Sequence, residues 1–235
     1  MRVYRAELRK LTSLPSVWAA AAVGLLLPAA LTFLNVRAAG GNVDRGFQEL
    51  AFGVVGAIIL GVVAVSSEYT TEGENAGGGR QITTSLTVVP SRRRLLVTKL
   101  AAVITAVAAL ATVSSTITLT IVEAFGVSDF GRLPGVVLYW VLTALLASGL
   151  TLVTRNGILP LTVLILNTSV VTVTYLLAKL TPLAVFFPDL AGFRMFIERV
   201  DLPVRLSPVT GGLVMTAWVV ALLAAGFLVF RGRDA

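Results

Sequence analysis

The sequence predicts an all-α membrane protein with six transmembrane helices in a single domain, residues 1–235. Six apolar stretches divide the chain almost from end to end. Each is long enough to cross a bilayer, because ~30 Å of hydrocarbon at ~1.5 Å per residue requires about 20 residues. The composition agrees with this, since 56% of the residues are hydrophobic and only 13% are charged, about half the charged fraction of an ordinary soluble domain.

The chain begins with an amphipathic segment, Met1–Leu11, at helical spacing. One face carries the apolar residues Val3, Tyr4, Leu8 and Leu11. The other carries the basic residues Arg2, Arg5 and Arg9. A helix of this kind lies in the plane of the lipid headgroups with its apolar face down. It is either a simple membrane-surface anchor or an elbow helix that also contacts a cytoplasmic partner.

The six predicted spans follow in order. They are Leu14–Val36, Phe47–Ser67, Leu95–Val122, Leu133–Thr154, Asn156–Ala178 and Ser207–Phe230. In the second span the uncharged run starts at Leu50, which places Glu49 at the membrane interface. The fourth and fifth spans are separated only by a tight turn at residues 155–157.

The charges of the connecting segments predict the orientation. An even number of spans places both termini on one side, and that side carries 12 of the 19 Lys and Arg residues. Cytoplasmic loops are enriched in Lys and Arg, so both termini are predicted to be cytoplasmic. The pI near 10.5 then reflects orientation and anionic lipid rather than nucleic acid.

A cleaved signal peptide is the alternative for the first span, because residues 2–10 are basic and Ala38-Ala39 follow the apolar run. The apolar run Val17–Val36 is longer than the about 7–15 residues of a signal core. Cleavage would also leave five spans and upset the charge balance. A true first span is therefore the preferred prediction.

The longest predicted cytoplasmic segment is Glu68–Arg94, which opens with acidic residues and continues through Gly77–Gly79 to the basic run Arg92–Arg94. Ser91 is a predicted N-cap for the helix that enters the membrane, and the basic run is typical of a charge stop at the cytoplasmic interface. The glycines do not form a phosphate-binding loop, which requires G-x-x-x-x-G-K-[ST] after a buried strand.

The predicted external segment Lys179–Arg205 alternates apolar clusters with charges. Neither cluster, Leu183–Phe187 or Phe193–Ile197, is long enough to span. Because a water-exposed loop rarely carries so many Phe residues, we expect one or two short helices that re-enter the outer interface. An ordinary surface lid is the alternative.

Two features of the predicted spans concern helix packing and the substrate path. Gly53, Ala57 and Gly61 form a small-residue stripe that permits close helix packing, either within the chain or between chains. Asn167-Thr168 lies midway along the fifth span, where an amide faces other helices or lines a substrate path. No acidic or basic residue lies deep in any predicted span, which disfavours self-powered ion-coupled transport.

The segment Ser67–Gly73, S-E-Y-T-T-E-G, followed by Thr87–Leu100, T-V-V-P-S-R-R-R-L-L-V-T-K-L, is similar to the E-x-x-x-G and Pro–basic–K-L pattern of type 2 ABC export permeases. With the N-terminal helix, six spans and the re-entrant segment, essentially the whole chain resembles the transmembrane subunit of an ABC exporter. The glycine-rich insert Asn75–Arg80 departs from the family pattern and leaves the position of the coupling helix open.

The resemblance implies that the path and the ATPase are formed by separate chains. Two permease chains, identical or homologous, form the path, and two copies of a separate cytoplasmic ABC ATPase bind ATP and Mg²⁺; this chain binds no cofactor or metal itself. The residues expected to contact the ATPase are Glu68, Tyr69, Glu72, Glu74 and Arg80. We expect close packing between the spans at Gly53, Ala57 and Gly61. We expect Asn167 and Thr168 to line the translocation path.

Three function classes are compared. An export permease of a bacterial inner membrane, moving an apolar or amphipathic cargo such as a drug, antibiotic, lipid or peptide, is the preferred prediction. An ATPase-independent channel or scaffold is the second. An intramembrane enzyme is disfavoured, because the chain has no Cys and no His, and no carboxylate deep in a span, to act as nucleophile, base or metal ligand.

Overall fold

The computed structural model describes residues 2–38, 44, 46–69, 91–122, 131–170, 173–198, 204 and 206–232. Every regular element in these residues is a helix. Five helices are long and apolar enough to cross a membrane. They are α2 (Pro15–Ala38), α3 (Phe47–Ser66), α5 (Arg92–Ile121), α7 (Leu133–Thr154) and α11 (Pro208–Gly232). They agree within a few residues with five of the six predicted spans.

The predicted fifth span is wrong as one continuous helix. It consists of α8 (Ile158–Ile165), the π-helical turn η2 (Leu166–Val170) and α9 (Val173–Leu180), with a bend of 59° between the two arms. The break falls where Asn, Thr and Ser are followed by a run of β-branched residues, all of which have low helix propensity. Counted as one bent span, this pair brings the number of spans to six.

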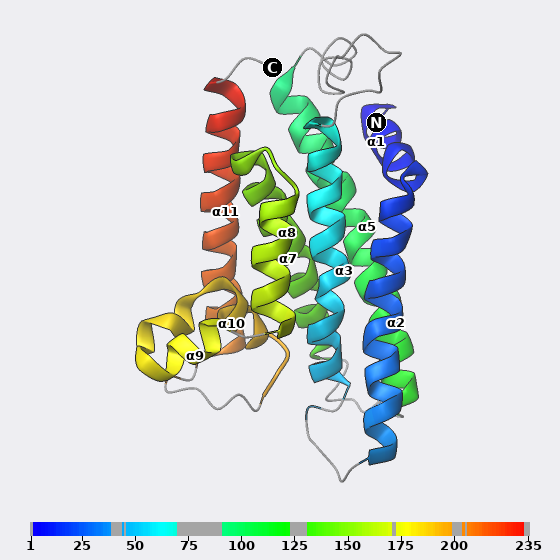
Figure 1. The fold of residues 1–235 in the computed structure, drawn as a ribbon, viewed down its shortest axis with the longest axis vertical. Coiled ribbons are helices and arrows are strands. Elements are labelled where there is room, and N and C mark those ends of the chain that lie inside the picture. Colours follow the sequence, from blue (N-terminus) through cyan, green and yellow to red (C-terminus); the bar gives the residue numbers. More distant parts are fainter. Residues whose placement is uncertain are drawn as a thin grey trace.

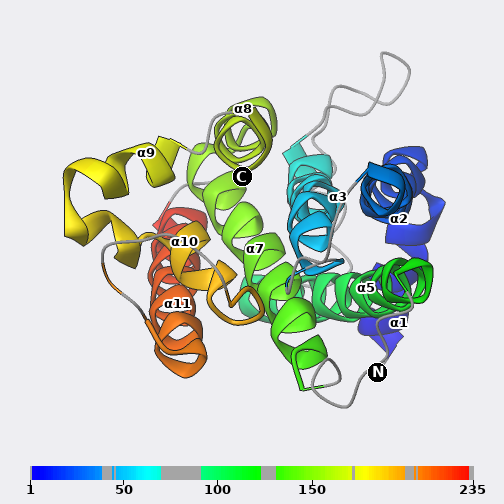
Figure 2. The ribbon, with the colours of Figure 1, turned by 90° about the horizontal axis from the view of Figure 1, so that it is seen from below.

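The amphipathic N-terminal helix is confirmed as α1 (Arg2–Ser13). Leu11 is buried, and Tyr4 and Leu8 pack against the core, whereas Arg5 and Arg9 are exposed. The helix lies against α5 (Figure 2), where the Tyr4 hydroxyl and Thr105 Oγ1 are hydrogen-bonded at 2.7 Å. The α1 helix therefore packs against the bundle.

The central pair of the bundle is α3 and α7, which are far more buried than the other long helices. In Figures 1 and 2, α2 and α5 lie on one side of this pair and α11 on the other, while α8 lies against both. The start of α1 and the end of α11 are at the same end of the bundle (Figure 1). We call this the amino-terminal end, and the other the opposite end.

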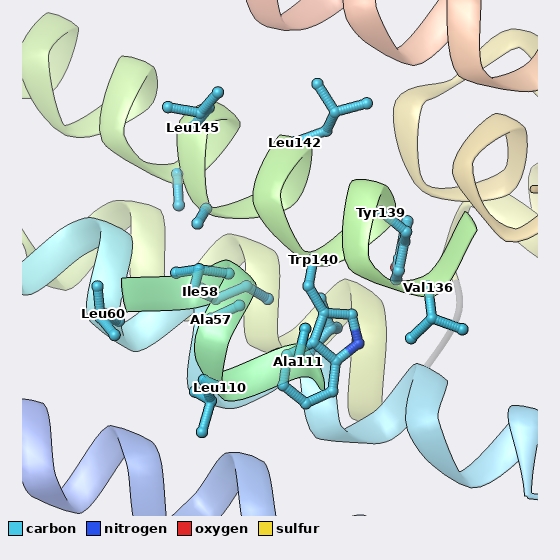
Figure 3. Close-up of a cluster of buried hydrophobic side chains, with 14 of the residues drawn as sticks. Ala57, Ile58, Leu60, Leu110, Ala111, Val136, Tyr139, Trp140, Leu142 and Leu145 are labelled. Carbon is cyan, nitrogen blue, oxygen red and sulfur yellow. The ribbon is translucent and has the colours of Figure 1, made fainter. Parts of the chain in front are cut away.

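The small-residue stripe of α3 packs against other helices of the same chain. A Cβ on Gly53 would lie 2.7 Å from the Trp140 ring and 2.9 Å from Pro28 Cγ, and Ala57 is completely buried. A Cβ on Gly61 would overlap the Ala144 carbonyl of α7. Figure 3 shows Trp140 extending from α7 into this core, where its Nε1 donates to the Leu50 carbonyl at 3.1 Å.

The segment between the last two predicted spans contains the two short helices η3 (Pro182–Phe186) and α10 (Pro188–Phe193). Each begins with proline, which is favoured at the first helical position. Phe193 and Phe196 pack against the Tyr139 ring at centroid distances of 5.4 and 5.2 Å. The expected short helices are therefore present, and α10 with the residues that follow it packs on α7; their re-entry into the outer interface stays a prediction.

Candidate functional site

Four charged side chains meet at the amino-terminal end, and we refer to them as the ion-pair cluster: Glu7, Lys10, Glu68 and Lys99. Lys99 Nζ lies 2.8 Å from Glu7 Oε2 and 2.8 Å from Glu68 Oε1. Lys10 Nζ also donates to Glu68 Oε1. The two carboxylates and two ammonium groups balance, so the cluster as a whole carries no net charge.

Three elements bring the cluster together. Glu7 lies on the inward face of α1 beside Leu8, Glu68 lies in the 3-10 turn η1 (Ser67–Tyr69) that follows α3, and Lys99 lies two turns into α5. The side chains of Lys99, Glu68 and Glu7 are only 4%, 5% and 9% exposed. Such a cluster ties its elements firmly, because removing one partner of a buried ion pair leaves an uncompensated charge.

Of the residues predicted to contact the ATPase, Glu68 needs a revised interpretation. Its carboxylate is buried inside the ion-pair cluster and so does not lie on a surface that a partner would reach. Tyr69 is half-buried, with the Arg155 guanidinium 5.9 Å from its ring centroid. Glu72, Glu74 and Arg80 lie outside the described residues, as does the Gly77–Gly79 insert, so their predicted contacts stay predictions.

The ion-pair cluster does not follow from the sequence pattern, because its members are far apart along the chain. Lys99 is one of the 12 basic residues on the predicted cytoplasmic side, and Glu7 belongs to neither of the two faces described for Met1–Leu11. Each nevertheless carries a signal, since Glu7 adjoins the apolar face of an amphipathic helix and Lys99 interrupts an apolar run. A charge in such a position requires a partner, although the sequence does not say which one.

A second charged contact joins three elements at the opposite end. Arg132, just before α7, donates to the Asp44 carboxylate, which is completely buried, and through Nε to the Phe196 carbonyl at 2.8 Å. The guanidinium carbon lies 4.0 Å from the Phe47 ring centroid, and the Glu198 backbone N–H donates to Asp44 at 3.1 Å. Arg132 therefore fastens the starts of α3 and α7 to the segment after α10.

Asn167, predicted near the path, bridges the break in the bent span. Its Nδ2 donates to Asp189 Oδ2 at 2.8 Å, and its Oδ1 accepts from Thr174 N at 3.3 Å and Thr174 Oγ1 at 3.0 Å. Thr174 is the second residue of α9, and its backbone N–H has no partner within that helix. Asn167 therefore caps α9 and ties it to α10, which favours the hydrogen-bonding interpretation. Thr168 is half-buried beside it, and its place in the path stays a prediction.

The Asn167 bridge leads to a test by exchange. The N167D variant should lose about 1–3 kcal/mol of stability, because it faces Asp189 with a second carboxylate and leaves no donor for it. The D189N variant should be close to wild type, since an amide oxygen also accepts from Asn167. The double variant N167D/D189N should recover most of the loss, because the donor and acceptor are simply exchanged. Thermal unfolding in nanodiscs, followed by Trp fluorescence, measures all three; an equally unstable double variant would contradict the bridge.

No group of three or more His, Cys, Asp or Glu side chains in the described part of the chain is placed to hold a metal ion. The chain matches no protein-family model, and no curated protein matches it. The arguments for its function therefore come from its own residues and geometry.

Proposed function

We propose that this chain is the transmembrane subunit of an ATP-driven exporter of the type 2 ABC class in a bacterial plasma membrane, with both termini cytoplasmic. The observation that carries the proposal is the ion-pair cluster. It joins α1, the end of α3 and the start of α5 at the point where segment 70–90 leaves Tyr69 and returns to Ser91. A force applied to that segment would therefore reach three helices together.

The energy source is proposed to be a separate cytoplasmic ATPase that holds segment 70–90. Charged residues of the described long helices lie near the helix ends, and the most deeply placed, Lys99, is the eighth residue of α5. A transporter driven by its own ion gradient usually carries ionisable groups at mid-membrane. The arrangement fits a pathway whose movement is driven from outside the membrane.

The path is proposed to form between two permease chains, identical or homologous. Apolar side chains are exposed along the outer faces of α2 and α11, among them Trp18, Leu26, Leu213 and Val220. These faces suit lipid or a second chain. The scarcity of charge along the spans favours an apolar or amphipathic cargo, such as a drug, antibiotic, lipid or peptide.

The proposal is tested first by co-purification. The tagged chain, extracted from native membranes in mild detergent, should retain an ABC ATPase at a one-to-one ratio, identified by mass spectrometry. A preparation that contains no ATPase, in detergent and again in nanodiscs with ATP and Mg²⁺, would contradict the proposal. It would favour an ATPase-independent channel or scaffold.

The second test concerns the acidic residues of segment 70–90. The E72A/E74A variant should lower transport several-fold while the folded chain and the ATPase's own hydrolysis persist, because only the contact that links them is weakened. Glu68 is left unchanged in this variant, since its loss would disturb the ion-pair cluster and confuse coupling with folding. The matched control is E198A, an exposed carboxylate at the opposite end. Wild-type transport by E72A/E74A would remove these residues from the coupling contact.

A further inference from the structure

Glu49 is a buried carboxylate without an ionic partner in the described part of the chain. Its side chain accepts from Asn35 Nδ2 at 2.8 Å and from the Gly46 backbone N–H at 2.8 Å, and the residue is only 5% exposed. The other buried carboxylates, Glu7, Asp44 and Glu68, are each paired with Lys or Arg. Glu49 differs from all of them.

Among the described residues, the negative charge of Glu49 is offset by two hydrogen bonds and by the start of α3, with no cation. Glu49 is the third residue of α3, and its carboxylate accepts from the backbone N–H of Gly46, the residue just before the helix. The N-terminus of a helix is equivalent to about half a positive charge. A buried carboxylate is costly unless it is paired or coordinates a cation, so a positive ligand would complete the compensation.

Three buried hydroxyl groups toward the opposite end of the bundle, where α3 begins, lack a hydrogen-bond partner in the described residues: Thr32, Ser115 and Thr118. Each residue is at most 1% exposed. Other hydroxyls in these helices behave differently, since Thr112 and Thr143 donate to the carbonyl four residues before them. Unpartnered buried hydroxyls are uncommon and point to a bound water, ion or ligand.

The contacts of neighbouring residues place Thr32 beside Glu49. Pro28, Thr32 and Asn35 follow one another at helical spacing along one face of α2. Pro28 meets α3 at Gly53 and Asn35 meets it at Glu49. Thr32 therefore faces the first turns of α3, between these two contacts.

Thr118 approaches the same turn from α5. A Cβ on Gly46 would lie 4.0 Å from Thr118 Cγ2, and the Gly46 N–H is the group that holds Glu49. Ser115 lies one turn further from the opposite end on the same face of α5. Thr32 of α2 and Thr118 of α5 thus lie beside the first turn of α3, which carries Glu49, and the methyl group of Thr118 is the part that faces Gly46.

We propose that Glu49, Thr32 and Thr118 form a binding site for one Na⁺ ion, buried between α2, α3 and α5. The donors are all oxygen, which suits a hard cation, and one carboxylate balances one positive charge. A divalent ion would call for further carboxylates, which the described residues do not supply here. The ion would complete the charge balance of Glu49 and join three helices.

The test uses the purified chain in nanodiscs of neutral lipid, in NaCl or in N-methyl-D-glucamine chloride of the same ionic strength. Saturating Na⁺ should raise the Tm of the wild type by roughly 2–4 °C or more, and ²²Na⁺ should bind at one ion per chain. E49Q and T32V/T118V should abolish both effects. The control T112V, whose hydroxyl is exposed and bonded within α5, should keep both.

The proposal is overturned if the wild-type Tm is the same in the two salts and no ²²Na⁺ binds, in which case Glu49 serves only as a helix cap. It is also overturned if T32V/T118V keeps the Na⁺ response. That variant leaves the hydrogen bond from the Gly46 N–H to Glu49 intact, so it decides the matter even where E49Q does not fold. No ATPase or transport is needed, and the result does not depend on the proposed function.

Discussion

Replacing Lys99 with methionine is expected to destabilise the bundle by about 3–5 kcal/mol, because it leaves the buried Glu7 carboxylate without its cation. Among the described residues, Lys99 is the ionic partner of Glu7, and both Lys99 and Lys10 pair with Glu68. The loss should appear as a lower Tm and as faster hydrogen exchange along α1. The same variant should also weaken the proposed coupling between the ATPase and transport, since α1 and α5 would no longer move with the end of α3.

Two further variants separate charge balance from packing. K10M should cost much less, because Lys10 is 23% exposed and Glu68 keeps Lys99. E7Q/K99M should be more stable than K99M, because it removes one charge of each sign and leaves the neutral pair of Lys10 and Glu68. A K99M chain as stable as the wild type, or an E7Q/K99M chain no better than K99M, would show that the ion-pair cluster does not hold α1.

The second large effect is expected at Gly61, in the centre of the bundle. G61A should cost about 1–3 kcal/mol, because the added Cβ would overlap the backbone carbonyl of Ala144, and the two central helices would have to move apart. Backbone cannot rotate away as a side chain can. The shift would be measured as a change in Tm, with buried Trp140 as a fluorescence probe of the contact between α3 and α7.

Gly212 of α11 is the matched control for this substitution. A Cβ there would meet only the flexible Met195 side chain, at 3.2 Å from its sulfur, and methionine adapts readily to such a change. G212A should therefore be close to neutral, and helix propensity should favour alanine equally at both sites. If G61A is as stable as G212A, the close approach of α3 and α7 is not required for the fold.

The two predictions address different levels of organisation. The Gly61 contact concerns packing in the middle of the bundle, where helices touch backbone to backbone. The ion-pair cluster concerns its amino-terminal end, where charge holds together segments that are far apart along the chain. If both predictions hold, the bundle consists of a tightly packed centre with an ionic fastening beside the segment that is proposed to receive the ATPase.

Local features were well predicted from the sequence. The five long helices follow from apolar runs of about 20 residues, and the Ser91 cap of α5, whose Oγ accepts from Arg94 N at 3.3 Å, follows from one residue type at a helix start. The faces of α1 follow from the spacing of Tyr4, Leu8 and Leu11. Each of these depends on residues within a few turns of one another.

The bend at Asn167 was only partly predictable from the sequence. The low helix propensity of the surrounding residues was visible in the sequence, but hydropathy over the whole stretch still indicated one straight span. The bridge from Asn167 to Asp189 joins residues 22 positions apart, and it supplies the hydrogen bonds that the broken helix lacks. A hydropathy average contains no information about such a bridge.

By itself, the sequence determined that the chain is helical, that most of it consists of membrane-length apolar helices, and that an amphipathic helix leads into them. Only the tertiary structure decided that Lys99 meets Glu7 across 92 positions, that Arg132 meets Asp44 across 88 positions, and that Glu49 has no ionic partner among the described residues. The physical reason is that apolarity and propensity act over one helix. The cost of a buried charge is settled only when helices pack and bring, or fail to bring, its partner.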